Sequence, residues 1–134
     1  MIVRFGDEDH AGIVYYPRYF HFFHVAFEDF FDQQGLPYSE ILDVDKVGFP
    51  TAHLETDFRK PLRFGDRFDI DVWVETIGKS SAVFRYRGRR AGDSDDTATA
   101  RLTVVAVDMR TLRPVPLPDK VRVLFAQNQT PPAA

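Results

Sequence analysis

The segment from Pro17 to Gln34 constrains the fold more than any other part of this chain. It reads PRYFHFFHVAFEDFFDQQ, contains no glycine and no internal proline, and is followed by Gly35. Proline is tolerated in the first turn of a helix, and glycine is frequent just after the last turn. The sequence therefore predicts one long helix over residues 17–34.

Aromatic side chains dominate one face of this predicted helix. At about 100° per residue, five phenylalanines project to the same side. They are Phe20, Phe23, Phe27, Phe30 and Phe31, whereas His21, Glu28, Asp29 and Asp32 lie mostly outside this face. Such an amphipathic helix requires an apolar surface on which to pack.

The pattern changes after residue 50, where apolar and polar side chains alternate as they do in strands. Polar turns at Phe64-Gly65-Asp66 and at residues 92–96 separate the alternating runs. We predict strands over Thr51–Lys60, Phe68–Ile77, Ser81–Arg90 and Thr97–Asp108, a short fifth strand over Met1–Phe5, and a helical turn or two over Asp119–Phe125. In the first long strand, one face is expected to carry Ala52, Leu54, Thr56 and Phe58. This order of elements indicates an α+β fold with one sheet packed on one helix.

Length and composition favour a single domain. The chain has 134 residues, of which 44% are hydrophobic and 28% charged, so it can bury one core and is too short for two ordinary domains. We expect one domain over residues 1–126 and a disordered tail over residues 127–134. No apolar run approaches the ~18 residues of a membrane span, and the N-terminus lacks a signal-peptide core. We therefore expect a cytoplasmic protein without membrane insertion.

Charge and residue usage argue against several classes of function. The formal net charge of -3 does not fit a protein that binds nucleic acid. The chain has no cysteine, which excludes disulfides, thiolate metal ligands and a cysteine nucleophile. His21, His24 and Glu28 lie along about one helical ridge, but zinc-binding helices usually carry two histidines four residues apart. We expect neither a metal site nor a cofactor.

The densest cluster of ionisable side chains immediately precedes the long helix. Asp7, Glu8, Asp9 and His10 are consecutive in the loop over residues 5–12. The positive end of a helix dipole favours a carboxylate, and the free N–H groups there can bind an acyl oxygen. The residues alone leave two interpretations open. The loop either caps the helix with solvated acids, or places a base or nucleophile beside an oxyanion site.

The segment FGDEDHAGIVYYPRYF, with the helix and strands behind it, resembles the 4-hydroxybenzoyl-CoA thioesterase family of hotdog-fold enzymes. The positions of the family pattern are occupied here by Asp7, Asp9, Gly12, Ile13, Val14, Tyr16, Pro17 and Tyr19. The resemblance includes the Phe64-Gly65-Asp66 turn and covers roughly residues 2–108. It implies an antiparallel sheet of about five strands wrapped around the long helix, and a homodimer or homotetramer.

The resemblance also implies where the chemistry takes place. Asp9 is the implied catalytic carboxylate, which either attacks the thioester carbonyl or activates a water molecule. The backbone N–H of Tyr16 stabilises the developing oxyanion, and Gly12 allows the chain to turn sharply.

The same resemblance implies a binding region for the substrate's CoA. Family members bind the nucleotide and phosphates at the positions of Lys79, Ser80 and Ser81, although the residues alone equally allow Lys79 to be an ordinary solvated lysine. Other basic side chains that could contact CoA are Arg59, Lys60, Arg85, Arg87, Arg89 and Arg90, of which the last four are expected to form a local positive face.

Three residues depart from the family pattern. Glu8 and His10 replace the cysteine and proline common in relatives, which adds charge beside Asp9. His24 occupies the position at which the hydroxybenzoyl-specific enzyme has an acid that contacts the ring hydroxyl. We expect His24 to contact the far end of a different acyl group or, alternatively, to be a hydrogen-bonded core histidine.

Together these features predict an acyl-CoA thioesterase. Its expected substrate is an aromatic, benzoyl- or hydroxybenzoyl-type, or a short acyl-CoA, which is hydrolysed to the free acid and CoA. Two alternatives remain open: a thioesterase for acyl carrier protein or short aliphatic acyl-CoA substrates, and a hotdog module that binds CoA esters without turnover.

Overall fold

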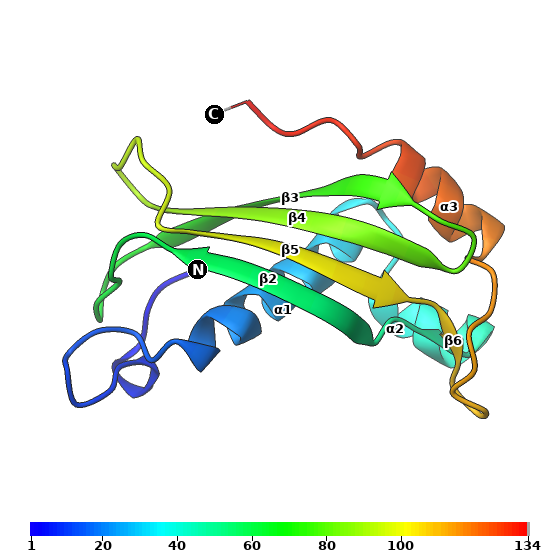
Figure 1. Cartoon of the computed structure of the whole chain (residues 1–134), viewed down its shortest axis with the longest axis horizontal. Helices are drawn as coiled ribbons and strands as arrows, with labels where there is room; N and C mark the ends of the chain where they lie inside the picture. The colour runs from blue at the N-terminus through cyan, green and yellow to red at the C-terminus, as the bar shows by residue number, and fades with distance from the viewer. Residues whose placement is uncertain (134) are drawn as a thin grey trace.

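One long helix crosses the concave side of a curved antiparallel sheet (Figure 1). The computed structural model describes residues 1–133, and Ala134 lies outside the described residues. The helix is α1 (Pro17–Gln33), which begins at the predicted residue. The other elements are, in chain order, η1 (Phe5–Asp7), α2 (Tyr38–Glu40), η2 (Ile41–Asp45), β1 (Val47–Gly48), β2 (Thr51–Phe58), β3 (Phe68–Ile77), β4 (Ser81–Arg90), β5 (Ala98–Val105), β6 (Val107–Asp108) and α3 (Asp119–Ala126).

The main sheet has four antiparallel strands in the order β2-β5-β4-β3, and β1 pairs with β6 in a separate two-stranded sheet. The predicted α+β architecture is therefore confirmed, and the bounds of β3 and β4 are those predicted. The last predicted strand is divided into β5 and β6. The division falls at Ala106, whose N–H donates instead to the Ser80 carbonyl in the β3–β4 turn.

Two expectations about strands are wrong. Residues 1–5 do not form a fifth strand: Ile2 makes a single bridge with Arg67, and the chain then turns into η1. In β2, the regular alternation of side chains fails at Ala52. A β-bulge between Thr51 and His53 inserts one extra residue there, which shifts the side chains that follow to the opposite face.

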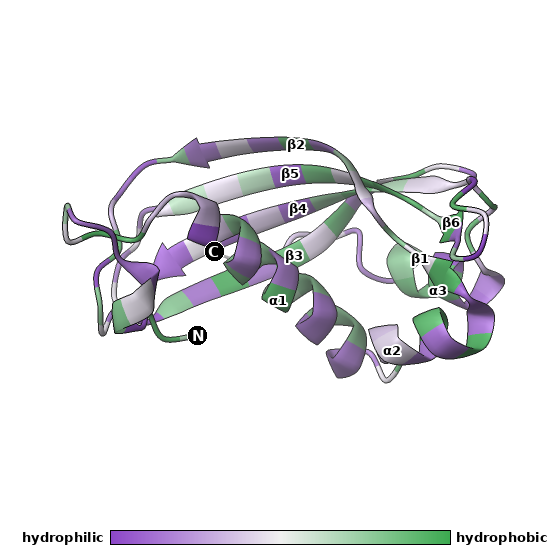
Figure 2. Ribbon diagram, turned by 90° about the horizontal axis from the view of Figure 1, so that it is seen from below, coloured by the Kyte–Doolittle hydropathy of each residue, from purple (hydrophilic) through white to green (hydrophobic). Residues whose placement is uncertain are grey.

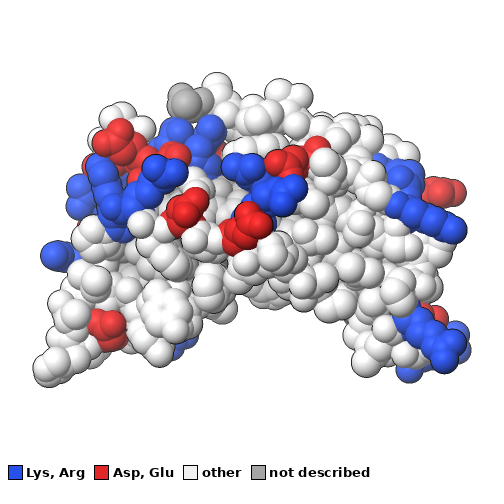
Figure 3. All heavy atoms as spheres, viewed as in Figure 1, with Lys and Arg blue, Asp and Glu red and all other residues white. Residues whose placement is uncertain are grey.

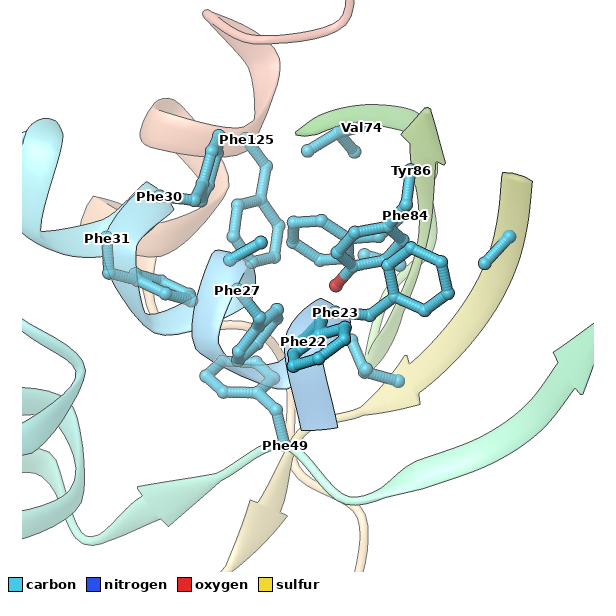
Figure 4. Packing of buried hydrophobic residues seen from close by; sticks show 14 of the residues in the cluster. Phe22, Phe23, Phe27, Phe30, Phe31, Phe49, Val74, Phe84, Tyr86 and Phe125 are labelled. Carbon is cyan, nitrogen blue, oxygen red and sulfur yellow. The ribbon is translucent and has the colours of Figure 1, made fainter. Parts of the chain in front are cut away.

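Phenylalanine rings from α1 fill the space between the helix and the sheet (Figure 4). Figure 2 shows α1 running across the sheet, with hydrophobic and hydrophilic residues alternating along its ribbon. The buried residues of α1 are Tyr19, Phe22, Phe23, Ala26, Phe27, Phe30 and Phe31. The rings of Phe27 and Phe84 meet edge to face with their centroids 5.1 Å apart. The buried face is broader than predicted and includes Phe22, while Phe20 is only half-buried, because the sheet curves around one side of the helix.

The C-terminal segment lies along the outer edge of β3. The Val74 N–H donates to the Asn128 carbonyl at 2.8 Å, and an Arg87 N–H donates to the Pro132 carbonyl at 2.7 Å. The Asn128 side chain also donates to the Leu124 carbonyl, at the end of α3. Residues 128 and 132 thus accept hydrogen bonds from β3 and β4, and disorder of the tail over residues 127–134 stays an expectation.

Candidate active site

The acidic loop closes on itself immediately before α1. The Asp9 N–H donates to the Ile13 carbonyl, and the Gly12 N–H donates back to the Asp9 carbonyl, both at 3.0 Å. Gly12 has a φ of +78°, a left-handed conformation that side chains other than glycine seldom adopt. Gly12 therefore makes the sharp turn that the sequence predicts for it.

Two contacts attach this loop to the segment between β2 and β3. The Val14 N–H donates to the Leu62 carbonyl at 2.8 Å. The Phe64 N–H donates to Glu8 Oε2 at 3.0 Å. The loop is consequently attached to the segment between β2 and β3 both before and after Asp9, which limits how far its carboxylates can move.

Each of the three adjacent carboxylates accepts one backbone N–H, but the three side chains differ in exposure. Asp7 Oδ2 accepts the Arg4 N–H at 2.9 Å, and Glu8 is occupied by the contact described above. Asp9 Oδ1 accepts the Ala11 N–H at 2.8 Å, whereas its Oδ2 has no partner within residues 1–133. The Asp9 side chain is exposed. Asp7 and Glu8 are half-buried, so Asp9 is the one of the three acids that is open to a substrate, with one oxygen fixed by the Ala11 N–H.

The N-terminus of α1 begins next to this loop. Tyr16 is the N-cap residue, no side chain caps this end, and Pro17 follows in the first turn. In the described part of the chain, the Tyr16 N–H makes no hydrogen bond. An unbonded N–H at the positive end of a helix attracts an anionic oxygen. The predicted oxyanion position is therefore chemically available.

A groove of about 460 Å³ opens beside Tyr16. It is lined by Ile13, Val14, Tyr16, Tyr19, Phe58, Arg59, Lys60 and Pro61. Arg59, one of the predicted binding residues, therefore lies near the acidic loop. Its neighbour Lys60 is 3.2 Å from Asp95 Oδ2, so part of its charge is compensated.

A second, apolar cavity of about 180 Å³ lies further along α1, between the helix and the sheet. Its lining comprises Phe20, Phe23, His24, Phe27, Phe49, Thr51, Leu54, Tyr86, Leu102 and Val104. His24 is exposed, with its Nε2 3.7 Å from Glu28 Oε1 and its ring stacked on Phe27 at 6.4 Å. Within this single chain His24 is therefore not buried in the core, and it lies at the rim of this cavity.

Lys79, Ser80 and Ser81 lie in the turn between β3 and β4, at the other end of the sheet. The acidic loop contacts residues that precede β3, whereas Lys79 follows the last residue of this ten-residue strand. Ten residues at about 3.3 Å each span roughly 33 Å. Within one chain, the predicted CoA-binding turn and Asp9 are therefore not brought together.

The arginines of β4 do not form the expected positive face. Each has a carboxylate partner: Arg85 with Glu75, Arg87 with Asp71, Arg89 with Asp96, and Arg90 with Asp93. The N–O distances in these pairs are 3.2, 3.0, 3.0 and 3.1 Å. Figure 3 shows the blue and red groups interspersed over the outer face. The sequence pattern failed here because it did not show which acids would lie on the neighbouring strand and turn.

Three tyrosines are buried or half-buried near α1, and their hydroxyls differ. Burial raises the pKa of Tyr19 and of Tyr38. A backbone N–H partly offsets this rise in each, from Leu62 to Tyr19 and from Phe49 to Tyr38. Burial alone raises the pKa of Tyr86, whose hydroxyl has no partner within the described residues. Tyr86 was not singled out from the sequence; the available signal was a hydroxyl on the same side of the strand as Ala82 and Phe84.

Comparison with known proteins assigns the family. The model of the thioesterase-like superfamily matches residues 3–125. The chain belongs to this superfamily. Membership confirms the predicted hotdog fold and the predicted class of enzyme, a thioester hydrolase. The narrower 4-hydroxybenzoyl-CoA thioesterase family stays a prediction.

Individual relatives of this thioesterase-like chain cover most of its length. It is 31% identical to a 1,4-dihydroxy-2-naphthoyl-CoA hydrolase of Picosynechococcus over 89% of this chain and 84% of the relative. A solved gentisyl-coenzyme A thioesterase is 32% identical, with a TM-score of 0.84 over 94% of this chain and 97% of that one. A 1,4-dihydroxy-2-naphthoyl-CoA thioesterase from Synechocystis has a TM-score of 0.87 at 23% identity, covering 98% and 96%. The last of these similarities concerns the fold alone.

Two further findings concern residues 1–133 of this thioesterase-like chain. No helix there has the length and apolar character needed to cross a bilayer. No three histidine or acidic side chains in that part gather closely enough to hold a metal ion.

Proposed function

We propose that this protein is an acyl-CoA thioesterase that hydrolyses aromatic acyl-CoA thioesters, with Asp9 as its catalytic carboxylate. One observation carries this proposal: Asp9 is the exposed acid of the loop, fixed at one oxygen, and it precedes a helix N-terminus whose Tyr16 N–H makes no hydrogen bond within residues 1–133. The pairing of an unengaged carboxylate with an unengaged N–H donor is what thioester hydrolysis requires.

The reaction follows from the charges that these groups carry. Asp9 Oδ2 either attacks the thioester carbonyl carbon, forming an anhydride that water then cleaves, or removes a proton from the water that attacks. In both routes negative charge develops on the carbonyl oxygen, and the Tyr16 N–H with the α1 dipole stabilises it. The C–S bond then breaks, CoA leaves as its thiol, and the added water supplies the hydroxyl of the free acid.

The apolar cavity supports an aromatic acyl group as the substrate. Its walls are largely phenylalanine rings and aliphatic side chains, which favour a flat apolar group. Two relatives are named for thioesters of aromatic acids, 1,4-dihydroxy-2-naphthoyl-CoA and gentisyl-coenzyme A. His24, exposed at the rim, is positioned to contact polar groups of the substrate as it enters.

We propose further that the working unit is a homodimer joined along β2. This strand pairs only with β5 within the described chain, and seven of its eight residues are exposed. Leu54 and Phe58, apolar residues on this edge, are 37% and 46% exposed. Figure 3 shows the surface hollowed beneath β2, between the N-terminal loop and the β6 region. An unpaired edge with exposed apolar side chains is suited to pairing with a second copy.

Such a dimer would complete the site. Thr51 and Leu54 line the apolar cavity near the start of β2, while Phe58 lines the groove beside Tyr16 at its end. In an antiparallel pair, the start of one β2 lies opposite the end of the other. The catalytic loop of one chain would therefore face the acyl cavity of its partner.

The first experiment measures release of CoA thiol by the wild-type protein. Benzoyl-CoA, 4-hydroxybenzoyl-CoA, butyryl-CoA and a benzoyl-acyl carrier protein are compared at equal concentrations. The proposal predicts the highest kcat/KM with an aryl-CoA. A higher kcat/KM with the carrier-protein substrate or with butyryl-CoA would favour the alternative of a thioesterase for acyl carrier protein or short aliphatic acyl-CoA substrates. Tight binding of all CoA esters without thiol release would favour the binding module.

A mixing experiment tests the shared site. His24→Trp blocks the cavity mouth, and Asp9→Asn removes the carboxylate charge, so each homodimer is expected to be nearly inactive. A heterodimer of the two variants would contain one intact site, assembled from the unmodified loop of one chain and the unmodified cavity of the other. Activity should rise to as much as half of the wild-type value per heterodimer. No recovery in a heterodimer verified by mass would contradict an inter-subunit site.

A further inference from the structure

The inner end of the apolar cavity is formed by Tyr86. The cavity is bordered by Thr51 and Leu54 on the edge strand β2, then by Leu102 and Val104 on β5. Tyr86 lies on β4, the innermost strand that contributes to the lining. The exposure of these positions falls in the same direction, from 37% at Leu54 to 1% at Tyr86. A group that enters from the β2 edge would therefore meet Tyr86 last.

The Tyr86 hydroxyl is directed into this region without a partner. Figure 4 shows the ring extending from β4 toward α1, with its oxygen among the phenylalanine rings. The nearest labelled ring is Phe23, whose centroid is 5.2 Å from that of Tyr86. No donor or acceptor within residues 1–133 bonds to the hydroxyl. Buried tyrosine hydroxyls normally have a hydrogen-bonding partner, as Tyr38 does here with the Phe49 N–H at 3.0 Å.

The remaining polar side chains of the cavity are at its mouth. His24 and Thr51 are both exposed, and the rest of the lining is apolar. A ligand that reaches the inner end can thus satisfy only one polar group there. Because burial favours the protonated phenol, the hydroxyl can both donate and accept.

The cavity volume limits the size of the acyl group. An apolar cavity of about 150 Å³ is known to accommodate benzene. The cavity of about 180 Å³ beside α1 therefore suits one substituted aromatic ring better than two fused rings.

We propose that Tyr86 determines specificity by hydrogen-bonding a hydroxyl substituent on a single-ring aromatic acyl group. This inference rests on the proposed function, since it requires that an aryl thioester enters the cavity. A site with a buried polar group rejects an analogue that leaves this group unpaired. The wild-type enzyme should therefore hydrolyse at least one hydroxybenzoyl-CoA isomer about tenfold or more faster, in kcat/KM, than benzoyl-CoA, and should disfavour a hydroxynaphthoyl-CoA.

The test compares Tyr86→Phe with the wild type on benzoyl-CoA and its three monohydroxy isomers. The variant should lose the preference, so that the best isomer and benzoyl-CoA differ by no more than about threefold, because kcat/KM falls for the hydroxy isomer and rises for benzoyl-CoA. Tyr38→Phe is the matched control, because it removes a buried hydroxyl that already has a backbone partner. It should lower Tm and leave the substrate ratio unchanged.

Thermal unfolding without substrate provides a separate readout. Removing an unpartnered hydroxyl should leave the Tm of Tyr86→Phe equal to or above that of the wild type. A clearly lower Tm would reveal a structural partner, such as a fixed water, and would overturn the proposal. A retained hydroxyl preference in an active Tyr86→Phe would overturn it while leaving the thioesterase function intact. Absence of turnover on every aryl-CoA by the wild type would overturn both.

Discussion

Glu8 and the backbone of Phe64 are joined by a hydrogen bond of 3.0 Å across 56 positions of the chain. The bond connects the acidic loop to the turn that precedes β3. Glu8 immediately precedes Asp9 in the sequence. Glu8 stands where family relatives commonly have cysteine, so its carboxylate adds a tether to this loop. In the proposed mechanism, Glu8 would therefore position the loop that carries Asp9.

Removing the hydrogen bond between Glu8 and the Phe64 N–H should reduce activity more than it reduces the free energy of unfolding. Glu8→Ala is expected to lower kcat/KM for an aryl-CoA by about tenfold, because a loop held at fewer points spends less time in the reactive geometry. Glu8→Gln retains an oxygen acceptor for the Phe64 N–H and should keep most of the activity. Steady-state kinetics with both variants checks this. Equal losses in the two would mean that the charge of Glu8, and not its hydrogen bond, matters.

Replacing Gly12 should disturb the loop through its backbone. Gly12→Ala forces a side chain into the left-handed region, at a cost of about 1 kcal/mol or more. No atom lies within 4 Å of the added Cβ, so crowding contributes nothing. Gly6→Ala is the control, since Gly6 has equally open surroundings and no positive φ. Urea unfolding should show a lower free energy of unfolding for Gly12→Ala but not for Gly6→Ala, and kcat should also fall for Gly12→Ala. Equal free energies of unfolding for the two variants would contradict this account.

Basic residues that bind the CoA phosphates should affect KM and not kcat. The Lys79 carbonyl accepts the Leu117 N–H at 2.9 Å, so the turn is fixed while its exposed ammonium group has no acidic partner in the described chain. Lys79→Ala and Arg59→Ala are each expected to raise KM several-fold, with an effect that weakens at high salt. Arg110→Ala, an exposed site outside both cavities, serves as control. An unchanged KM for Lys79→Ala would identify it as an ordinary solvated lysine.

Glu75 should make stability depend on pH. Hydrogen bonds from Arg101 and then Arg85 hold the pKa of this carboxyl below its usual range, with Arg101 Nε 2.7 Å from its oxygen. Its stabilising contribution is therefore fully present above the unfolded pKa of about 4.3 and is lost as pH falls through the lower folded pKa. Glu75→Gln should reduce the free energy of unfolding by about 1 kcal/mol at pH 7, and the difference should shrink below pH 4.

Urea unfolding at both pH values measures this difference. Glu40→Gln is the control, since the exposed Glu40 makes no ion pair among the described residues. A constant difference between Glu75→Gln and wild type over the whole pH range would contradict the assigned pKa direction.

Local patterns predicted the long helix and the strands of the main sheet, but not the short elements η1, α2, η2 and β1. The proline at 17 and the phenylalanine spacing located α1, and strict alternation located β3 and β4 to the residue. The alternation failed in β2, where the bulge at Ala52 depends on pairing with β5. It also could not reveal that each β4 arginine would have an acidic partner, because those acids lie on other segments.

The candidate site was predicted in part. The motif around Asp9 identified the loop, but only the folded chain shows that Asp9 is exposed while Asp7 and Glu8 are half-buried. The cavity formed by α1, β2, β5 and β4 was not predicted, because its walls are brought together from distant parts of the chain. Tyr86 acquires its importance only from this assembly.

The most direct test of the central claim is the rate of CoA thiol release from the preferred aryl-CoA by Asp9→Asn. Asparagine preserves the shape and the oxygen that accepts the Ala11 N–H, but it removes the charge that attacks carbon or accepts a proton. Asp43→Asn, at an exposed position remote from the site, is the control. We predict a loss of about two orders of magnitude or more in kcat for Asp9→Asn and none for the control. An Asp9→Asn protein that is folded and as fast as wild type would contradict the account, leaving Asp9 as an acid that only shapes the entrance to α1.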